Sequence, residues 1–230
     1  MARRCVVLST WGVCEGAPRD DDDATKKMLE KLPRLLRRRL TPLARTVFTA
    51  IDQCALETYD MPLVFSSTHG ELAKSFNMMR QIEAGEEISP THFSLSVHNA
   101  IAGLFAMAFN NQQQCSVIAP GMEGIAPGFI EALGLLQEGN ARVLLVFYDE
   151  PLVPFYPAEP FRLSADEMAL ALCLSADGKG LKLHFSRRPE SGNSGEQPLQ
   201  LPCLVNFLNN PEQGLVLRTA YKGWCWQIDV

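Results

Sequence analysis

Long apolar runs and a basic excess are both missing from this sequence of 230 residues. A membrane-spanning helix needs roughly 18 to 20 consecutive apolar residues; no such run occurs, so we expect no membrane span. Lysine and arginine number 21 against 26 aspartate and glutamate residues, which argues against a nucleic-acid-binding protein. The short apolar stretch after Arg3 and Arg4 is interrupted too early for a signal peptide, so we expect a cytoplasmic protein.

Motifs for nucleotide, metal and serine-hydrolase chemistry are also missing. The sequence has no G-x-G-x-x-G, no G-x-x-x-x-G-K and no G-x-S-x-G. The seven cysteines form no C-x-x-C pair, and their odd number argues against a disulfide framework, so we expect reduced structural thiols. His92 and His98 lie across a predicted turn, which is poor spacing for a metal site. We therefore expect neither a metal nor a cofactor.

What the sequence does contain is an alternation of apolar runs and amphipathic segments. The apolar runs predict strands over residues 5–9, 62–66, 115–119, 141–147, 168–174 and 181–185. Helical patterns cover residues 41–55, 71–82, 99–109 and a segment that ends at Gly139. Thr41 and Pro42 are good start signals for the first of these helices. This order predicts an α/β fold whose mixed sheet is covered by helices.

Three connections carry their own expectations. The Asp177-Gly178-Lys179-Gly180 turn predicts that the strands on either side of it pair antiparallel. Ser89-Pro90-Thr91 is expected to be a turn. Residues 187–198 are polar, contain Gly, Ser and Pro without periodicity, and predict a mobile loop. We expect residues 1–230 to form a single domain.

A basic segment follows the run of aspartates at residues 20–23. Its cations are Lys26, Lys27, Lys31, Arg34, Arg37, Arg38 and Arg39. The simplest interpretation is a solvated, partly helical surface. The alternative is a docking patch for an acidic protein.

Two small groups of polar residues invite a catalytic interpretation. Ser96 and His98 have the chemistry of a nucleophile and a base, but residues two apart project away from each other on a helix. We expect His98 to be a hydrogen-bonded structural residue at the start of a helix. Asp149 and Glu150 follow a buried strand, where α/β proteins place ligands. A carboxylate that fixes a loop is the simpler interpretation for them.

Four segments resemble a known family. The most specific is S-P-T-H-F-S-L-S-V-H-N-A over residues 89–100, and it is supported by residues 37–41, 67–72 and 143–151. These segments resemble the β-ketoacyl synthase N-terminal-like family, a shortened branch of the thiolase-fold ketosynthases. The resemblance implies a thiolase-like half-fold. It also implies that Ser96, His98, Asn99 and Asp149 belong to a structural family motif.

The same resemblance bears on catalysis. Active ketosynthases place a cysteine nucleophile where a strand ends and a helix begins, because a helix N-terminus lowers the pKa of a thiol. The matching position here is Met122, or Gly121, and neither has a nucleophilic side chain. Cys115 lies at the other end of the matching strand. The catalytic histidines belong to a second half of the fold that this sequence does not match. We therefore expect no catalytic residue and no condensation by this chain alone.

The resemblance implies instead a non-catalytic subunit similar to a chain-length factor. Thiolase-fold ketosynthases dimerise through the strand before the nucleophile, so the interface is expected at Gln113, Gln114, Cys115, Ser116, Val117 and Ile118. The partner would be a complete ketosynthase of polyketide or fatty-acid-like synthesis, with aryl polyene pigments as the favoured pathway. Substrates would arrive on an acyl carrier protein, whose acidic surface would meet Arg37, Arg38 and Arg39.

Two other functions stay open at this point. One is a divergent acyltransferase or hydrolase that uses Cys115, Ser96 or His98. The other is a freestanding carrier of acyl chains.

Overall fold

The computed structural model describes residues 4–18, 22–156, 163–188, 199–219 and 223–229. The strands are β1 (Arg4–Glu15), β2 (Leu63–Ser66), β3 (Cys115–Ile118), β4 (Arg142–Asp149), β5 (Met168–Ser175), β6 (Leu181–Arg188), β7 (Leu215–Arg218) and β8 (Gly223–Asp229). The helices are α1 (Asp23–Glu30), α2 (Arg34–Arg37), α3 (Pro42–Gln53), α4 (Leu72–Glu83), α5 (Pro90–Ser94), α6 (Ala100–Ala108), α7 (Ala126–Gln137) and α8 (Gln200–Asn209).

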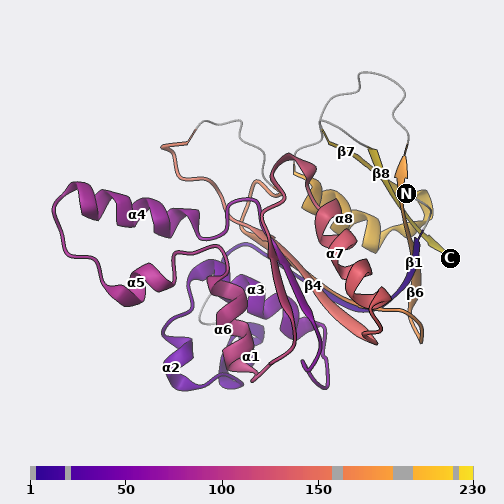
Figure 1. Cartoon of the computed structure of the whole chain (residues 1–230), viewed down its shortest axis with the longest axis horizontal. Helices are drawn as coiled ribbons and strands as arrows, with labels where there is room; N and C mark the ends of the chain where they lie inside the picture. Colours follow the sequence, from indigo (N-terminus) through magenta and orange to yellow (C-terminus); the bar gives the residue numbers. More distant parts are fainter. Residues whose placement is uncertain (1–3, 19–21, 157–162, 189–198, 220–222, 230) are drawn as a thin grey trace.

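The strands form one eight-stranded sheet in the spatial order β3-β2-β4-β5-β1-β6-β8-β7. Helices cover both of its faces (Figure 1). Strand β2 runs parallel to β3 and β4, whereas the other neighbours pair antiparallel. The predicted α/β fold with a mixed, helix-covered sheet is therefore confirmed.

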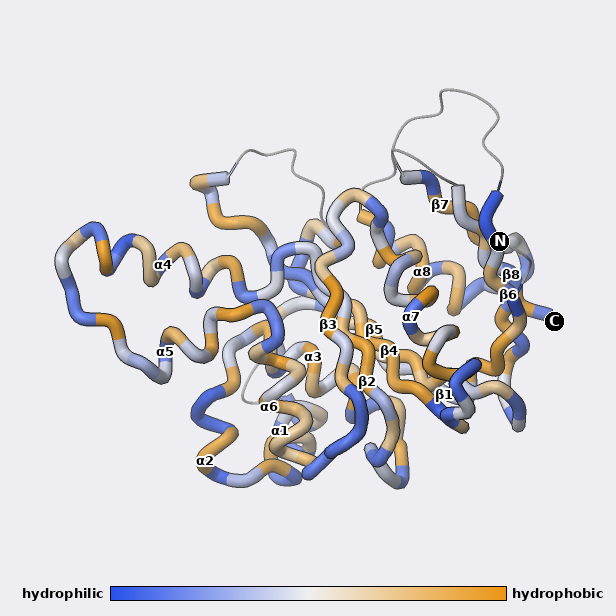
Figure 2. The backbone as a smooth tube through the Cα atoms, in the orientation of Figure 1, coloured by the Kyte–Doolittle hydropathy of each residue, from blue (hydrophilic) through white to orange (hydrophobic). Residues whose placement is uncertain are grey.

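The central strands β4 and β5 are buried on both faces. Successive side chains of a strand point to opposite faces, so those of β4 divide between two core clusters. Leu145 and Phe147 pack with α7 and α8, whereas Val146 and Tyr148 pack with α3 and α6 on the other face. Figure 2 shows the apolar colouring of this central part of the sheet. This two-sided burial explains the uninterrupted apolar run predicted as a covered strand.

Local signals set the ends of several helices. The Thr41 hydroxyl accepts a hydrogen bond from the N–H of Ala44 at 3.1 Å, and Pro42 occupies the first turn of α3. Gly139 follows α7 with φ +101°, a conformation that glycine adopts without strain. None of the helices in the described ranges has the length and hydrophobicity that crossing a membrane requires.

The antiparallel pair predicted across residues 177–180 is wrong. Strand β1 lies between β5 and β6 and pairs antiparallel with both. Val7 and Leu8 pair with β5 on one side and with β6 on the other. The connection between β5 and β6 therefore carries the chain from one side of β1 to the other. Gly180 makes the passage possible, because it has φ +148° and a Cβ there would lie 2.3 Å from the Leu8 carbonyl oxygen.

Two other predictions change in part. Residues 89–91, predicted as a turn, instead lead into α5, with Pro90 at its first position, where the missing N–H costs nothing. Within the predicted loop 187–198, Arg187 and Arg188 are the last residues of β6 and pair with Trp224 and Gly223 of β8. The rest of that segment, residues 189–198, lies outside the described residues.

We predict that Gly180→Ala lowers the free energy of unfolding by about 2–4 kcal/mol, because the methyl group meets the backbone of Leu8 and the positive φ is strained. Urea unfolding monitored by tryptophan fluorescence measures the change. Gly134→Ala in α7 is the matched control, since a Cβ there meets nothing within 4 Å. It should raise stability by up to about 1 kcal/mol. Equal stability of the Gly180 variant and the parent chain would contradict the close crossing.

Candidate functional site

The predicted nucleophile position lies in the turn between β3 and α7. A single 3-10 turn, Gly121–Glu123, joins the two elements. Gly121 and Gly124 have φ of +54° and +66°, so glycines permit this change of direction. The side chain of Met122 is 43% exposed at the junction. A strand, a turn and a helix thus follow one another as the resemblance implies, but neither Gly121 nor Met122 offers a group that could attack a thioester.

Gln200, the first residue of α8, contacts this turn. The sequence analysis did not identify this residue. Its buried side-chain oxygen accepts a hydrogen bond from the N–H of Ile125 at 3.2 Å. A Cβ on Gly124 would lie 2.2 Å from the same oxygen, so only glycine fits beside Gln200. The hydroxyl of Thr219 also donates to the Glu123 carboxylate at 3.5 Å. Residues from the C-terminal part of the chain therefore hold the turn. The only sequence feature that could have indicated a tight turn here is the pair of glycines in G-M-E-G, residues 121–124.

Cys115 lies at the beginning of β3, on the opposite end of the strand from this turn. The residue is exposed as a whole, yet the chain around its sulfur removes enough water to raise the pKa of the thiol above its ordinary value. A catalytic cysteine needs the reverse, a pKa lowered by a cation or a helix N-terminus. Cys115 is therefore a neutral thiol with the wrong environment for a nucleophile.

Strand β3 forms one edge of the sheet. The carbonyls of Gln114 and Ile118 accept hydrogen bonds from the N–H groups of Leu63 and Ser67 at 2.9 and 3.2 Å. Because backbone groups alternate in direction along a parallel strand, those of Cys115 and Val117 face away from β2. These outward groups are a template for another strand.

Other residues of the predicted interface hold β3 in place. The hydroxyl of Ser116 donates to Glu131 of α7 at 2.6 Å. The side-chain amide of Gln113 donates to Asp60 at 2.8 Å. A shallow hollow of about 470 Å³ runs along the strand and is lined by His98, Asn99, Cys115, Val117 and Ala119.

Ser96 and His98 lie close in sequence but bond to different groups. The Ser96 hydroxyl donates to the carbonyl of Phe93 at 2.8 Å. The Nε2 atom of His98 lies 3.4 Å from the carbonyl oxygen of Ile118, at the end of β3. Its ring also packs against Gly70, where a Cβ would come within 2.6 Å of Nδ1. This geometry connects the start of α6 to β3 and does not align a serine with a base. Asn99 precedes α6 without a side-chain capping bond.

Asp149 is a buried carboxylate at the end of β4. It accepts hydrogen bonds from the Ser67 hydroxyl at 2.8 Å, the Thr68 N–H at 3.1 Å and the Leu163 N–H at 2.6 Å. Burial raises the pKa of Asp149, and the bonds from Leu163 and Ser67 oppose that rise. The carboxylate joins three segments of chain that meet at the carboxyl ends of β2 and β4.

Three further carboxyl groups surround this position. Glu71 accepts a hydrogen bond from the Thr41 hydroxyl at 2.5 Å, and Glu150 accepts one from the N–H of Ala73 at 3.3 Å. Burial, followed by the nearby charges of Glu71 and Glu167, raises the pKa of Glu150 to about 7. Within the described residues no group of three or more His, Cys, Asp and Glu side chains could hold a metal ion. The carboxyl groups fasten the first turns of α3 and α4 instead.

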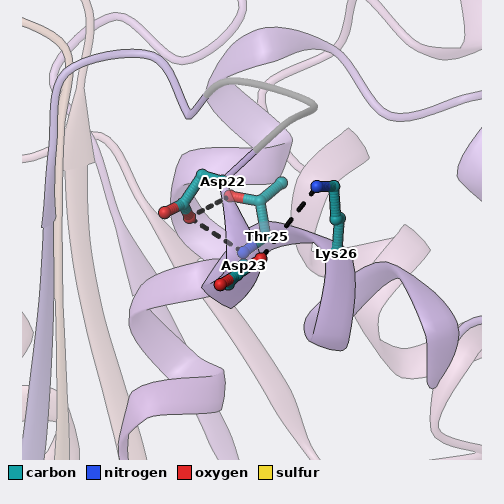
Figure 3. Close-up of polar contacts among 4 residues, drawn as sticks. All are labelled: Asp22, Asp23, Thr25 and Lys26. Carbon is teal, nitrogen blue, oxygen red and sulfur yellow. Dashed lines mark hydrogen bonds and ion pairs between the residues drawn. The ribbon is translucent and has the colours of Figure 1, made fainter.

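The basic segment at residues 26–39 begins with a capped helix. The Asp22 carboxylate accepts bonds from both the N–H and the hydroxyl of Thr25 at 3.0 Å, and Lys26 lies 4.0 Å from Asp23 (Figure 3). The hydrogen bond from the Thr25 N–H lowers the pKa of Asp22. The segment is therefore ordered from its first turn onward.

The three arginines of the predicted docking patch differ in what they contact. Arg37 stabilises the fold, because its guanidinium donates hydrogen bonds to the carbonyls of Leu32 and Glu30 at 2.9 and 3.1 Å. Arg38 and Arg39 are exposed. Leu35, 77% exposed, is in the same short segment. Leu35, Arg38 and Arg39 are thus the exposed part of this segment.

Comparison with known proteins agrees with this geometry. The family model described as the N-terminal domain of β-ketoacyl synthases matches residues 9–227. No curated protein matches the chain.

Solved structures share the fold. The structure of a ketosynthase (ApeO) in complex with its chain length factor (ApeC) from Xenorhabdus doucetiae matches with a TM-score of 0.73 and 23% identity, over 97% of this chain and 99% of that chain. The ishigamide ketosynthase/chain length factor matches with a TM-score of 0.51 and 13% identity, over 80% and 67% of the two chains. Ketosynthase twelve of the bacillaene synthase from Bacillus amyloliquefaciens gives 0.50 and 9%, over 84% and 47%. The predicted thiolase-like fold is confirmed.

We predict that Glu150→Gln changes how stability depends on pH. A carboxyl group with a pKa of about 7 in the fold, against an ordinary 4.5, holds a proton that the unfolded chain releases between those values. Stability therefore falls as pH rises through that window and stays lower above it. At pH ~8 the variant should be more stable than the parent by roughly 1–2 kcal/mol, allowing for solvent screening, and near pH ~4 the difference should vanish.

Urea unfolding at both pH values provides the measurement. Glu57→Gln, at an exposed position, is the control and should shift stability little at either pH. A gain for Glu150→Gln that is the same at both pH values would show that titration is not its cause.

Proposed function

The chain belongs to the β-ketoacyl synthase N-terminal domain family, and from that premise we propose that it is a non-catalytic subunit, similar to a chain-length factor. In this proposal it pairs with a complete β-ketoacyl-acyl-carrier-protein synthase, which supplies the nucleophile and the catalytic histidines. The subunit stabilises the active partner and helps to shape the space for the growing acyl chain.

The observation that carries the proposal is the turn after β3. Its strand, turn and helix are intact and held by Gln200, yet the position of the nucleophile is occupied by Gly121 or Met122. Condensation needs a thiolate to accept the acyl group. The remaining nearby thiol, Cys115, has a raised pKa. An ordered strand, turn and helix without a nucleophilic side chain at the predicted position supports a role in assembly over a role in chemistry.

A partner is supported by the sheet edge and by the similarity to a two-protein complex. Strand β3 presents the outward backbone groups of Cys115 and Val117. The match to the ApeO–ApeC structure spans nearly the whole of both chains, whereas the chain spans about half of the bacillaene ketosynthase. Because the ApeO–ApeC structure is a complex of two proteins, we propose a heterodimer or a larger assembly of this kind.

We further propose that the complex is cytoplasmic and acts in polyketide or fatty-acid-like synthesis, with aryl polyenes as the product class. Substrates of this chemistry arrive on an acyl carrier protein. Arg38, Arg39 and Leu35 offer exposed cationic and apolar contacts for it, while Arg37 stabilises the turn beneath them.

The rival enzyme, an acyltransferase or hydrolase, has less support. The Ser96 hydroxyl bonds to the Phe93 carbonyl rather than to His98, and Cys115 lacks an activating cation or helix N-terminus. The third function, a freestanding acyl carrier, would require a stable monomer that retains lipid on size-exclusion chromatography and has no affinity for a ketosynthase.

We predict that Cys115→Pro weakens the complex with the partner ketosynthase by at least tenfold in Kd. The proline removes the outward N–H of residue 115 while leaving the β2–β3 bonds, and proline is tolerated at the start of an edge strand. Cys115→Ala is the matched variant and should bind and support elongation as the parent does. Isothermal titration calorimetry and an elongation assay with and without this chain measure both effects.

If Cys115→Ala abolished turnover in an intact complex, the enzyme reading would replace the proposal. If the parent chain neither bound the ketosynthase nor changed its products, the subunit role would be wrong.

We predict that Arg38→Glu with Arg39→Glu raises the KM for the acyl carrier protein by roughly tenfold at low salt, because charges at the rim of an interface mainly steer association. The heteromer itself should form normally. Arg187→Glu with Arg188→Glu, also exposed, is the matched control and should leave that KM unchanged. An unaltered KM in the first variant would remove the carrier-docking role of this surface.

A further inference from the structure

Strands β6 and β8 have one face in the core and one face that the helices leave open. Leu183 and Phe185 of β6, with Trp224 and Trp226 of β8, pack in the core cluster beneath α7 and α8. Because successive residues of a strand point to opposite faces, the residues between them point the other way. None of the described residues of these two strands belongs to the second core cluster, beneath α3 and α6. This open face lies far from β3 along the sheet (Figure 2).

A thiol, an imidazole and a carboxylate are neighbours on the open face. Cys5 of β1 is exposed and is directly opposite His184 in the β1–β6 pairing. Directly opposite residues share a face and have Cβ atoms about 4.5–5.5 Å apart. On the other side of His184, its Nε2 atom lies 2.9 Å from the carboxylate of Asp229 in β8. The imidazole therefore lies between a thiol and a carboxylate from two different strands.

The contact with Asp229 determines which ring nitrogen can act as a base. A carboxylate only accepts hydrogen bonds, so Nε2 of His184 carries the hydrogen, and Nδ1 of the neutral ring keeps its lone pair. Nδ1 makes no hydrogen bond within the part of the chain that the structure describes. It is thus available to take the proton of Cys5, as a base beside a nucleophilic thiol does. The other charged or titratable side chains of β6 and β8 on this face are Lys182, Arg188 and Cys225.

The surroundings of the three side chains select the chemistry. They do not converge as ligands, since no group of His, Cys, Asp and Glu in the described ranges could hold a metal ion. Cleavage of an amide needs donors for an oxyanion and a proton for a poor leaving group. The N–H groups of these paired strands are used in the sheet. A thioester makes the smaller demand, because its leaving group is a thiol, as the attacking group is.

We propose that Cys5 is a site of S-acylation that accepts an acyl group from a thioester, with His184 as the base and Asp229 as a positioning residue. The Sγ atom of Cys5 forms a bond to the carbonyl carbon, and the bond from that carbon to the thioester sulfur breaks. The proton of Cys5 passes to Nδ1 of His184 and then to the departing thiolate. One thioester is consumed and one is formed, so no oxidant or reductant is needed. This activity goes beyond the proposed subunit function and does not involve the edge strand β3.

The test incubates the full chain with the octanoyl thioester of N-acetylcysteamine and follows each cysteine by peptide mass spectrometry. Cys203, an exposed thiol of α8, is the internal reference. Cys5 should acquire the octanoyl group at least about tenfold faster than Cys203, because general-base catalysis contributes at least that much. His184→Gln should remove this difference. Ser186→Ala, on the same strand and face, is the matched control and should change the rate less than threefold.

Asp229 is tested by exchange of its side chain. Asp229→Asn should slow acylation of Cys5 by about three- to tenfold, since the imidazole loses its carboxylate partner, and Asp229→Glu should restore most of the rate. Acylation of Cys203 should be the same in both variants. Circular dichroism and urea unfolding should match the parent, because Asp229 is exposed. Equal slowing by Asn and Glu would overturn the positioning role.

The remaining outcomes concern the site itself. Equal acylation of Cys5 and Cys203, or a rate at Cys5 that His184→Gln leaves unchanged, overturns the inference. Fast alkylation of Cys5 by iodoacetamide without acylation by the thioester overturns it as well, since the thiol is then reactive but the substrate class is wrong. The assay contains no ketosynthase. Its failure therefore leaves the subunit function standing, and failure to bind a ketosynthase leaves the S-acylation site standing.

Discussion

The buried carboxylate of Asp149 is the interaction on which the candidate site depends. Its donors include the neighbouring residues Ser67 and Thr68, which follow β2, and Leu163, which lies much further along the chain. The carbonyl of Leu163 in turn accepts the N–H of Leu201, next to Gln200, whose side chain holds the turn at Ile125. Each buried donor left without an acceptor costs about 1–3 kcal/mol. One carboxylate thus fixes the segment after β2 and is linked, through Leu163, to the turn after β3.

The turn after β3 does not depend on the side chain at the predicted nucleophile position. It is held by glycine geometry and by Gln200, and neither involves the side chain of residue 122. A residue without a nucleophilic group is therefore compatible with this turn. The same region presents a strand edge and a shallow hollow beside it. The proposed subunit role rests on these features, because an edge strand leaves backbone groups for another strand to pair with.

The local parts of the fold were predictable because their signals lie within a few residues of one another. Thr41 with Pro42 starts α3, Gly139 ends α7, and the apolar run of β4 reads as a strand covered on both faces. The pairing across residues 177–180 was not predictable in this way. A glycine turn has the same local pattern whether the next strand returns beside the first or crosses to the far side of β1. The distinction is made by contact with Leu8, more than 170 residues earlier in the chain.

The sequence by itself determined the family, the mixed α/β class and the absence of a nucleophilic residue at positions 121 and 122, because motifs, periodicity and residue identity are written along the chain. Only the tertiary structure decided that Gln200 supports the turn after β3, that Arg37 donates to backbone carbonyls while Arg38 and Arg39 stay exposed, and that β3 forms an edge of the sheet. The reason is physical. Hydrogen-bond partners, burial and sheet edges are set by which distant segments come together, and no local pattern of residues specifies that.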